Sequence, residues 1–197
     1  MIDLEEELDL LDQEIESEHP PNKIPKWLTK VVSVFYFIMI ALLLMFFIVN
    51  CIFFRVLVPT ASMAPTISVG EQLLVQSAVF DGEYSYGDIL VFESDESDDL
   101  LVKRMIGKAG DKIDIVGGVV YRNGKALKEE EYLGSYDDYS GSFQVPEDCY
   151  FFLGDNRVNS NDSRYWVNPY IKKGNIKGRM VMHLYPKMYV CTNVEEE

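Results

Sequence analysis

Residues 31–54 read VVSVFYFIMIALLLMFFIVNCIFF, an uncharged run of 24 residues that decides how the rest of the chain is organised. A helix rises about 1.5 Å per residue, so this run would reach about 36 Å and could cross a hydrocarbon core of about 30 Å. A buried helix of a soluble protein is rarely so long and so uniformly apolar. The run therefore predicts a single N-terminal transmembrane helix at residues 31–54.

The charges on either side of this run predict its orientation. Lys23, Lys26 and Lys30 precede it, whereas only Arg55 follows it closely. Positive flanks favour the cytoplasmic side. A cleavable secretory signal is the alternative, but its apolar core is usually about 7–15 residues long. We expect a retained, single-pass anchor in the cell membrane, with a cytoplasmic N-terminus and the rest of the chain outside.

The net charge of −14 is concentrated in short acidic runs. Residues 3–18 hold nine acidic groups and no basic one, so residues 1–30 are expected to form an acidic cytoplasmic tail, and residues 191–197 a second acidic tail. Such runs are usually solvated. Apolar residues at helical spacing in the first tail leave an unknown cytoplasmic partner as the alternative. Nucleic-acid binding is not expected, because no basic stripe could meet phosphates.

The segment that follows the apolar run has the pattern of a β protein. Short runs of Val, Ile, Tyr and Phe alternate with turn residues, and Asn123-Gly124 is a strong hairpin signal because both residues tolerate positive φ. No helix–strand alternation occurs, which argues against a parallel α/β sheet. We expect a mostly β, extracytoplasmic domain at residues 56–190, an antiparallel sheet with a small β insertion at 108–149. The expected strands are 73–76, 88–92, 101–106, 112–116, 119–122, 150–153 and 177–185.

Metal and disulfide chemistry find little support in the sequence. His19 and His183 are the only histidines, and neither HExxH nor CxxC occurs. Protein zinc sites take about three or four His, Cys or carboxylate ligands, so no metal and no cofactor is expected. Cys51 lies in the apolar run, and nothing in the spacing of Cys149 and Cys191 requires that they pair.

Two polar residues in apolar surroundings suggest nucleophilic chemistry. Ser62 stands in VPTASMAPTI (58–67), and Lys103 stands in LLVKRMI (100–106). A serine hydroxyl needs a base to take its proton, and at a pKa of about 10.4 only about one lysine in 2,500 is neutral at pH 7. Burial could lower that pKa to about 8 and leave roughly one lysine in ten neutral. From the residues alone, a Lys-Arg pair on an edge strand is the alternative.

Four short segments follow one another behind the apolar run: PTASMAPT (59–66), GDILVF (87–92), KRMIGKAGD (103–111) and GDNRVNSNDSR (154–164). Together they resemble the characteristic boxes of type I signal peptidases. These membrane-bound Ser-Lys peptidases release secreted proteins from their signal peptides. The resemblance covers most of residues 56–186, and the short insertion and single anchor are similar to Gram-positive bacterial members.

The resemblance implies a role for each matching residue. Ser62 would be the nucleophile and Lys103 the general base of a serine endopeptidase. The Thr60 hydroxyl and the backbone N–H of Ser62 would form the oxyanion hole. Ser160 would orient the Lys103 amine through a hydrogen bond. Four charged residues would brace the surrounding structure: Arg104, Asp155, Asp162 and Arg164.

The resemblance also implies the reaction and the partners. The catalytic β domain would cleave signal peptides from secreted preproteins at the outer membrane surface through an acyl-enzyme, beside membrane lipid. For Met63 and Trp166, contact with substrate or the membrane interface and ordinary core packing are equal alternatives. A non-catalytic, membrane-anchored binding module on the same fold is the alternative function. Self-cleaving repressor peptidases share Ser-Lys chemistry but lack a membrane span.

Overall fold

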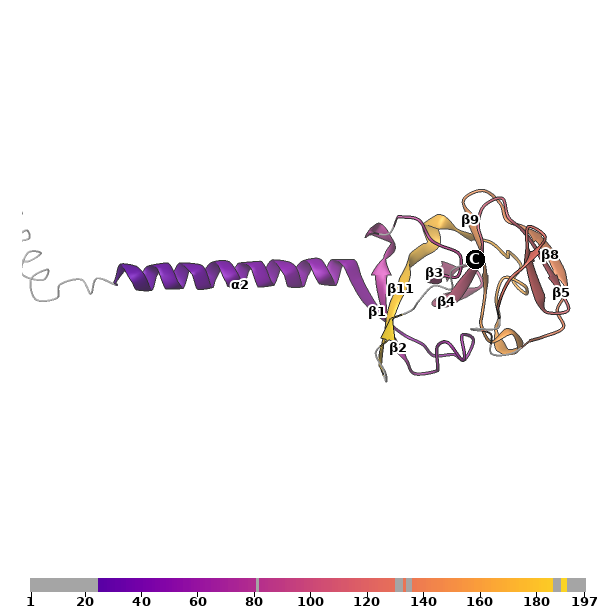
Figure 1. Cartoon of the computed structure of the whole chain (residues 1–197), viewed down its shortest axis with the longest axis horizontal. Coiled ribbons are helices and arrows are strands. Elements are labelled where there is room, and N and C mark those ends of the chain that lie inside the picture. Colours follow the sequence, from indigo (N-terminus) through magenta and orange to yellow (C-terminus); the bar gives the residue numbers. More distant parts are fainter. Residues whose placement is uncertain (1–24, 81, 130–132, 134–135, 186–188, 191–197) are drawn as a thin grey trace, which may run out of the picture. The chain divides into compact units, whose positions relative to one another are not determined.

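The computed structural model describes residues 25–80, 82–129, 133, 136–185 and 189–190. The chain divides into two compact units, residues 1–47 and residues 48–197. Helix α2 (Lys26–Ile52) lies mostly in the first unit, and the second contains the strands (Figure 1). Three expectations concern residues outside the described ranges and remain predictions. They are a cytoplasmic partner of the acidic N-terminal tail, the acidic C-terminal tail and the open question of whether Cys191 pairs with Cys149.

Helix α2 contains most of the apolar run that predicted a transmembrane helix. It is long and apolar enough to cross a membrane, and none of its residues is buried. An apolar surface around the whole helix is what a lipid environment favours. The helix starts five residues before the expected span and ends at Ile52, because Phe53 and Phe54 belong to the first strand.

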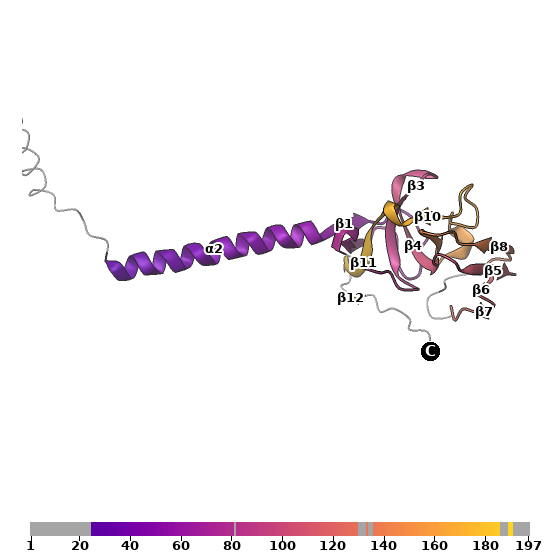
Figure 2. The same ribbon diagram turned by 90° about the horizontal axis from the view of Figure 1, so that it is seen from above.

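The larger sheet has eight strands, and its antiparallel pairing was expected from the sequence, although strands β1, β10 and β12 were not. Their order is β1-β2-β11-β3-β4-β9-β10, with β12 paired to β11 (Figures 1 and 2). Short 3-10 turns follow β2, β9 and β10 at Ala78–Phe80, Arg157–Asn159 and Lys173–Asn175. The strands are β1 (Phe53–Leu57), β2 (Gln72–Ser77), β3 (Ile89–Ser94), β4 (Ser97–Gly107), β9 (Cys149–Leu153), β10 (Ile171–Lys172), β11 (Ile176–Tyr185) and β12 (Tyr189–Val190).

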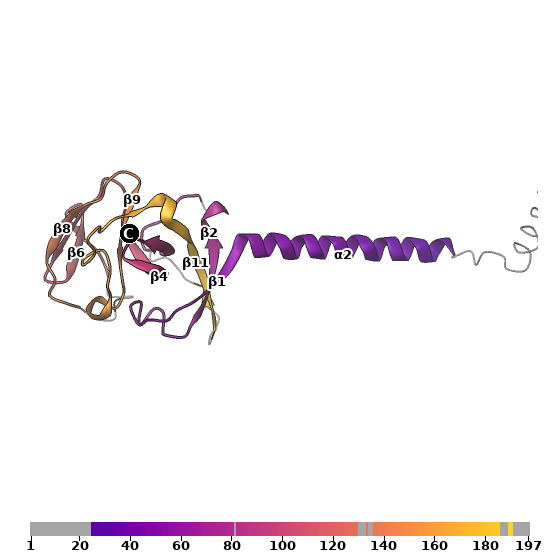
Figure 3. The ribbon, with the colours of Figure 1, turned by 180° about the vertical axis from the view of Figure 1, so that it is seen from behind.

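The expected insertion contains a second, four-stranded sheet in the order β7-β6-β5-β8. Its strands are β5 (Lys112–Val116), β6 (Val119–Arg122), β7 (Lys125–Ala126) and β8 (Gly141–Gln144). The turn between β6 and β7 is Asn123-Gly124, with φ of 53° and 81°, the conformation that the sequence predicted. This small sheet lies at the end of the β unit away from β1 and β2 (Figures 1 and 3).

The core of the β unit lies on both faces of the large sheet. Alternate residues of β3 show this: Ile89 and Val91 belong to one buried cluster, and Leu90 and Phe92 to another. A strand that is buried on both faces reads as a continuous apolar run, which explains the sequence ILVF. The Trp166 ring packs edge-on against Phe92 in the second cluster, so it belongs to the core.

Candidate active site

Ser62 lies in the loop that joins β1 to β2. Backbone hydrogen bonds close the base of this loop, from the Val58 N–H to the Glu71 carbonyl at 3.0 Å and from the Gly70 N–H to the Val58 carbonyl at 2.8 Å. Met63 and Ile67 are fully buried in the core below the loop. These apolar anchors hold Ser62 in place, and the burial of Met63 agrees with its core-packing alternative.

Lys103 approaches Ser62 from β4, in the middle of the large sheet. Lys103 pairs with Leu90 of β3 across the ladder. The next residue, Arg104, pairs with Leu153 of β9 on the other side of β4. The Lys103 side chain is buried, and its Nζ lies 2.6 Å from Ser62 Oγ. The structure thus brings together two residues that are 41 positions apart in the sequence.

The surroundings of Lys103 change its acid–base behaviour. Burial is the largest effect and lowers the pKa of Lys103 from 10.5 to about 8, although the charges of Asp162 and Asp155 act to raise it. Arg164 lowers it further. At that pKa roughly one amine in ten is neutral at pH 7, so Lys103 can serve as a base without histidine.

Thr60 and Ser160, the other polar residues expected at the site, are placed differently. Thr60 Oγ1 lies 3.2 Å from Ser62 Oγ, within hydrogen-bond distance of the candidate nucleophile. Ser160 is buried, and its Oγ has no hydrogen-bond partner, so the expected bond to Lys103 is not formed in this structure. The amine donates to Ser62 instead.

A buried ion pair holds the four signature segments together. Arg104 makes a bidentate contact with Asp155, with Nε–Oδ1 of 2.8 Å and Nη2–Oδ2 of 2.6 Å. Its Nη1 donates to the Gly87 carbonyl at 2.9 Å, and the Thr66 hydroxyl donates to Asp155 at 2.5 Å. Thr66, Gly87, Arg104 and Asp155 come one from each segment, so this contact fixes the segments relative to one another.

A second ion pair braces the 154–164 loop. Arg164 contacts Asp162 through Nε at 2.8 Å and Nη2 at 2.9 Å, and both side chains are buried. Asp162 also accepts the Gly154 N–H at 3.0 Å. Asp162 therefore ties the two ends of the loop together within electrostatic reach of Lys103.

Sequence reasoning missed a residue that contacts the Ser62 loop directly. The Asn156 N–H donates to the Ser62 carbonyl at 3.1 Å, and its side-chain amide donates to the Ala61 carbonyl at 3.1 Å. Asn156 lies in the last signature segment, so its position was a signal that could have been used. It fixes the peptide groups on both sides of Ser62.

Histidine is a more usual base than lysine for a catalytic serine, so the surroundings of His183 matter. It is buried in β11, and its Nδ1 lies 2.7 Å from Glu71 Oε2. In the described part of the chain, no group of three or more His, Cys, Asp or Glu side chains could hold a metal ion. Lys103 is the basic side chain that the structure places at hydrogen-bond distance from Ser62 Oγ.

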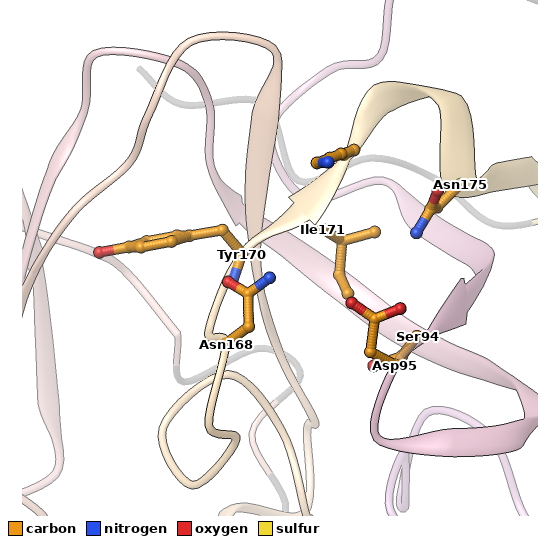
Figure 4. Close-up of a pocket in the computed structure, with 7 residues that line it drawn as sticks. Ser94, Asp95, Asn168, Tyr170, Ile171 and Asn175 are labelled. Atoms are coloured by element: carbon orange, nitrogen blue, oxygen red, sulfur yellow. The ribbon is translucent and has the colours of Figure 1, made fainter.

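A pocket of about 150 Å³ lies elsewhere on the β unit, and none of the candidate site residues lines it. Polar side chains of Asp95, Asn168 and Asn175 surround Ile171 there (Figure 4).

The sequence of this chain is similar to those of known proteins. Residues 31–185 match the family described as signal peptidase, peptidase S26. Signal peptidase I of Leptolyngbya laminosa is 37% identical over 139 residues, covering 66% of this chain and 67% of that protein. Signal peptidase I T of Bacillus subtilis is 40% identical over 138 residues, covering 64% and 72%. A crystal structure of signal peptidase I from Enterococcus faecalis aligns with a TM-score of 0.42 and 28% identity, covering 50% of this chain and 97% of that one. The chain thus belongs to the signal peptidase family of S26 serine peptidases, as a membrane-anchored member.

Proposed function

We propose that this peptidase removes signal peptides from secreted preproteins with Ser62 as nucleophile and Lys103 as general base. The observation that carries the proposal is the 2.6 Å contact between Lys103 Nζ and Ser62 Oγ, with both side chains buried. A buried neutral amine at hydrogen-bond distance can take the hydroxyl proton as the serine attacks.

In the proposed mechanism the proton moves between these two side chains. Neutral Lys103 accepts the proton of Ser62 as Oγ attacks the scissile carbonyl carbon. The Thr60 hydroxyl and the Ser62 N–H donate to the oxyanion that develops on the carbonyl oxygen. The Lys103 ammonium then protonates the leaving amine, which leaves an acyl-enzyme. Neutral Lys103 next takes a proton from water as the water oxygen attacks the acyl carbon. The Lys103 ammonium returns this proton to Ser62 Oγ as the acyl–Oγ bond breaks, which releases the signal peptide and restores both side chains.

Ser160 is proposed as the residue that positions Lys103 during this cycle. Its buried hydroxyl has no partner in the resting structure, and an unsatisfied buried hydroxyl is unfavourable. When Ser62 Oγ becomes acylated, the hydrogen bond between Lys103 Nζ and the free Ser62 hydroxyl is lost. Ser160 Oγ then accepts a hydrogen bond from Lys103 Nζ, which keeps the amine in position.

The membrane arrangement proposed here follows from the flanking charges. Residues 1–30 would form the cytoplasmic tail, α2 would cross the membrane once, and residues 56–190 would form the outer catalytic domain. Ser62 lies seven positions after Arg55, and so short a segment extends over at most about 25 Å. The nucleophile would therefore stay near the outer lipid surface, where the cleavage site of a signal peptide emerges.

Processing of a preprotein by the full-length chain in detergent tests this proposal. Ser62→Ala and Lys103→Ala should each abolish cleavage and acyl-enzyme formation while the protein stays folded. Lys112→Ala is a matched control, because the Lys112 amine is exposed in the small sheet. Cleavage by Lys103→Ala at the wild-type rate would disprove the proposed mechanism. A wild-type chain that binds signal peptide without a single turnover would instead support the non-catalytic binding module.

A further inference from the structure

Two acidic side chains of the insertion reach out of the small sheet and contact the 154–164 loop. Glu129 follows β7, and Asp137 precedes β8. The sequence places both within an acidic segment that would ordinarily be solvated. Both instead pair with arginines of the loop, Glu129 with Arg157 and Asp137 with Arg164.

The Glu129–Arg157 contact has the geometry of a strong, desolvated ion pair. Arg157 Nη2 lies 2.5 Å from Glu129 Oε1, and Nη1 lies 3.1 Å from Oε2. The side chains are only 2% and 4% exposed for Arg157 and Glu129. Burying two charges is costly unless they pair closely, and removing one partner leaves the other uncompensated. The position of Arg157 therefore depends on Glu129.

Arg157 transmits this constraint to the backbone beside the dyad. Its Nε donates to the Gly154 carbonyl at 3.0 Å. Gly154 packs so closely that a Cβ atom there would lie 2.2 Å from Ser160 Oγ and 2.5 Å from the Ser62 carbonyl oxygen. A displacement of Gly154 would thus move the residues that surround Ser62.

Asp137 supports the same loop from a second point. It forms an ion pair with Arg164, whose Nη2 also donates to the Arg157 carbonyl at 2.9 Å. Arg164 in turn holds Asp162. Two carboxylates of the insertion therefore fix two arginines that together set the path of the loop.

We propose that Glu129 is a positioning residue of the active site, through which the insertion holds the 154–164 loop against Ser62 and Lys103. Asp137 gives secondary support. This inference rests on the proposed Ser62–Lys103 function and assigns the insertion a part in that function. Glu129 touches neither reacting group, so its effect passes through Arg157 and Gly154.

The proposal predicts the direction of a pH effect. The charged groups acting on Lys103 are Asp155, Asp162 and Arg164, and Glu129 is not one of them. Burial has the largest influence on the Lys103 amine. A loosened loop would admit water and raise the pKa of Lys103 toward its ordinary value. Glu129→Gln should therefore need a higher pH to reach its maximal rate.

The test measures kcat and KM of the full-length chain in detergent across pH, with a signal-peptide substrate. At pH 8, Glu129→Gln should lower kcat about tenfold to hundredfold, as small misplacements do, with little change in KM. Part of the loss should be recovered at higher pH, and Glu129→Asp should restore more activity than Glu129→Gln. Asp114→Asn removes a carboxylate of the same insertion from an exposed pair with Lys112 and should match wild type.

Several outcomes would overturn the inference. Wild-type kcat in Glu129→Gln, or a loss of kcat without a shift of the profile to higher pH, excludes a positioning role. Lys103→Ala is measured in parallel. If Lys103→Ala stays active, the proposed dyad is wrong. If Lys103→Ala is inactive and Glu129→Gln is normal, only the inference about Glu129 is wrong.

If Glu129→Gln does not fold, the double variant Glu129→Met/Arg157→Met replaces the pair with apolar side chains, which buried sites often tolerate. That variant should show the same loss and pH shift, and wild-type kinetics in it would disprove the proposal.

Discussion

Two pairs of charged residues, one in each sheet of the β unit, lie in opposite surroundings. In the large sheet, Lys103 and Arg104 are buried and bonded to specific partners. In the small sheet, Lys112 and Asp114 form a 2.9 Å pair in which the lysine is 58% exposed. Burial strengthens the interactions of a polar group and makes its loss costly, whereas solvent screens an exposed pair. We therefore expect substitutions among the buried charged residues of the large sheet to have much larger effects than substitutions at the exposed Lys112–Asp114 pair.

The largest effect is expected at the glycine beside the dyad. Gly154→Ala would place a Cβ within 2.5 Å of the Ser62 carbonyl oxygen, so Ser62 or the loop must move. We expect a loss of kcat of about a hundredfold, because catalysis is sensitive to displacements near 1 Å. Gly174→Ala is the control, since a Cβ there meets no atom within 4 Å. Equal kcat values for the two variants would show that the tight packing at Gly154 is not needed for activity.

The next effect is expected at the ion pair that joins the four signature segments. Asp155→Asn leaves the Arg104 guanidinium buried beside a neutral amide. Breaking a buried pair in this way costs about 3–5 kcal/mol of folding free energy. Chemical denaturation of the full-length chain should show this loss. An unchanged denaturation midpoint would mean that the pair is not a main support of the large sheet.

A core substitution in the small sheet separates stability from catalysis. Ile113 is fully buried, and Ile113→Ala should cost about 2–5 kcal/mol, as large-to-small core substitutions do. Because the insertion holds the 154–164 loop, activity should fall at temperatures where the small sheet begins to open. Thermal unfolding and kcat measured on the same samples would check this. Loss of stability with wild-type activity up to the unfolding midpoint would argue that the sheets are independent.

The smallest effect is expected at the exposed pair of the small sheet. Asp114→Asn removes the ion pair with Lys112 but keeps an oxygen that can accept the hydrogen bond from Ser142. Exposed pairs contribute little, so the thermal midpoint should stay close to that of the wild type. A shift as large as that of Asp155→Asn would contradict the contrast between the two sheets.

Local sequence signals predicted the regular parts of the fold well. Strands 112–116 and 119–122 were expected with their observed bounds, because Gly117-Gly118 and Asn123-Gly124 mark both turns through positive φ. Strand β8 was missed, since GSFQ offers a single apolar side chain in an acidic, tyrosine-rich segment. Strand β1 was missed because its first two phenylalanines extend the apolar run.

Some site residues could be proposed from local sequence, and others only from contacts between distant segments. Ser62 and Lys103 could be proposed from the sequence because each stands in a short recognisable segment. Glu129 and Asp137 could not, because an acidic run looks the same whether it is solvated or paired with distant arginines. Only the fold shows that they meet Arg157 and Arg164.

The pH dependence of kcat/KM for the wild-type chain tests whether Lys103 is the general base. A lysine base is active when neutral, so activity should rise with pH through an apparent pKa of about 8. His183→Gln, which alters the pair with Glu71, should leave that value unchanged. With Lys103 as the base, we expect a single rise near pH 8 that is absent in Lys103→Ala. A rise near pH 6.5 that disappears in His183→Gln, or one that persists in Lys103→Ala, would contradict it.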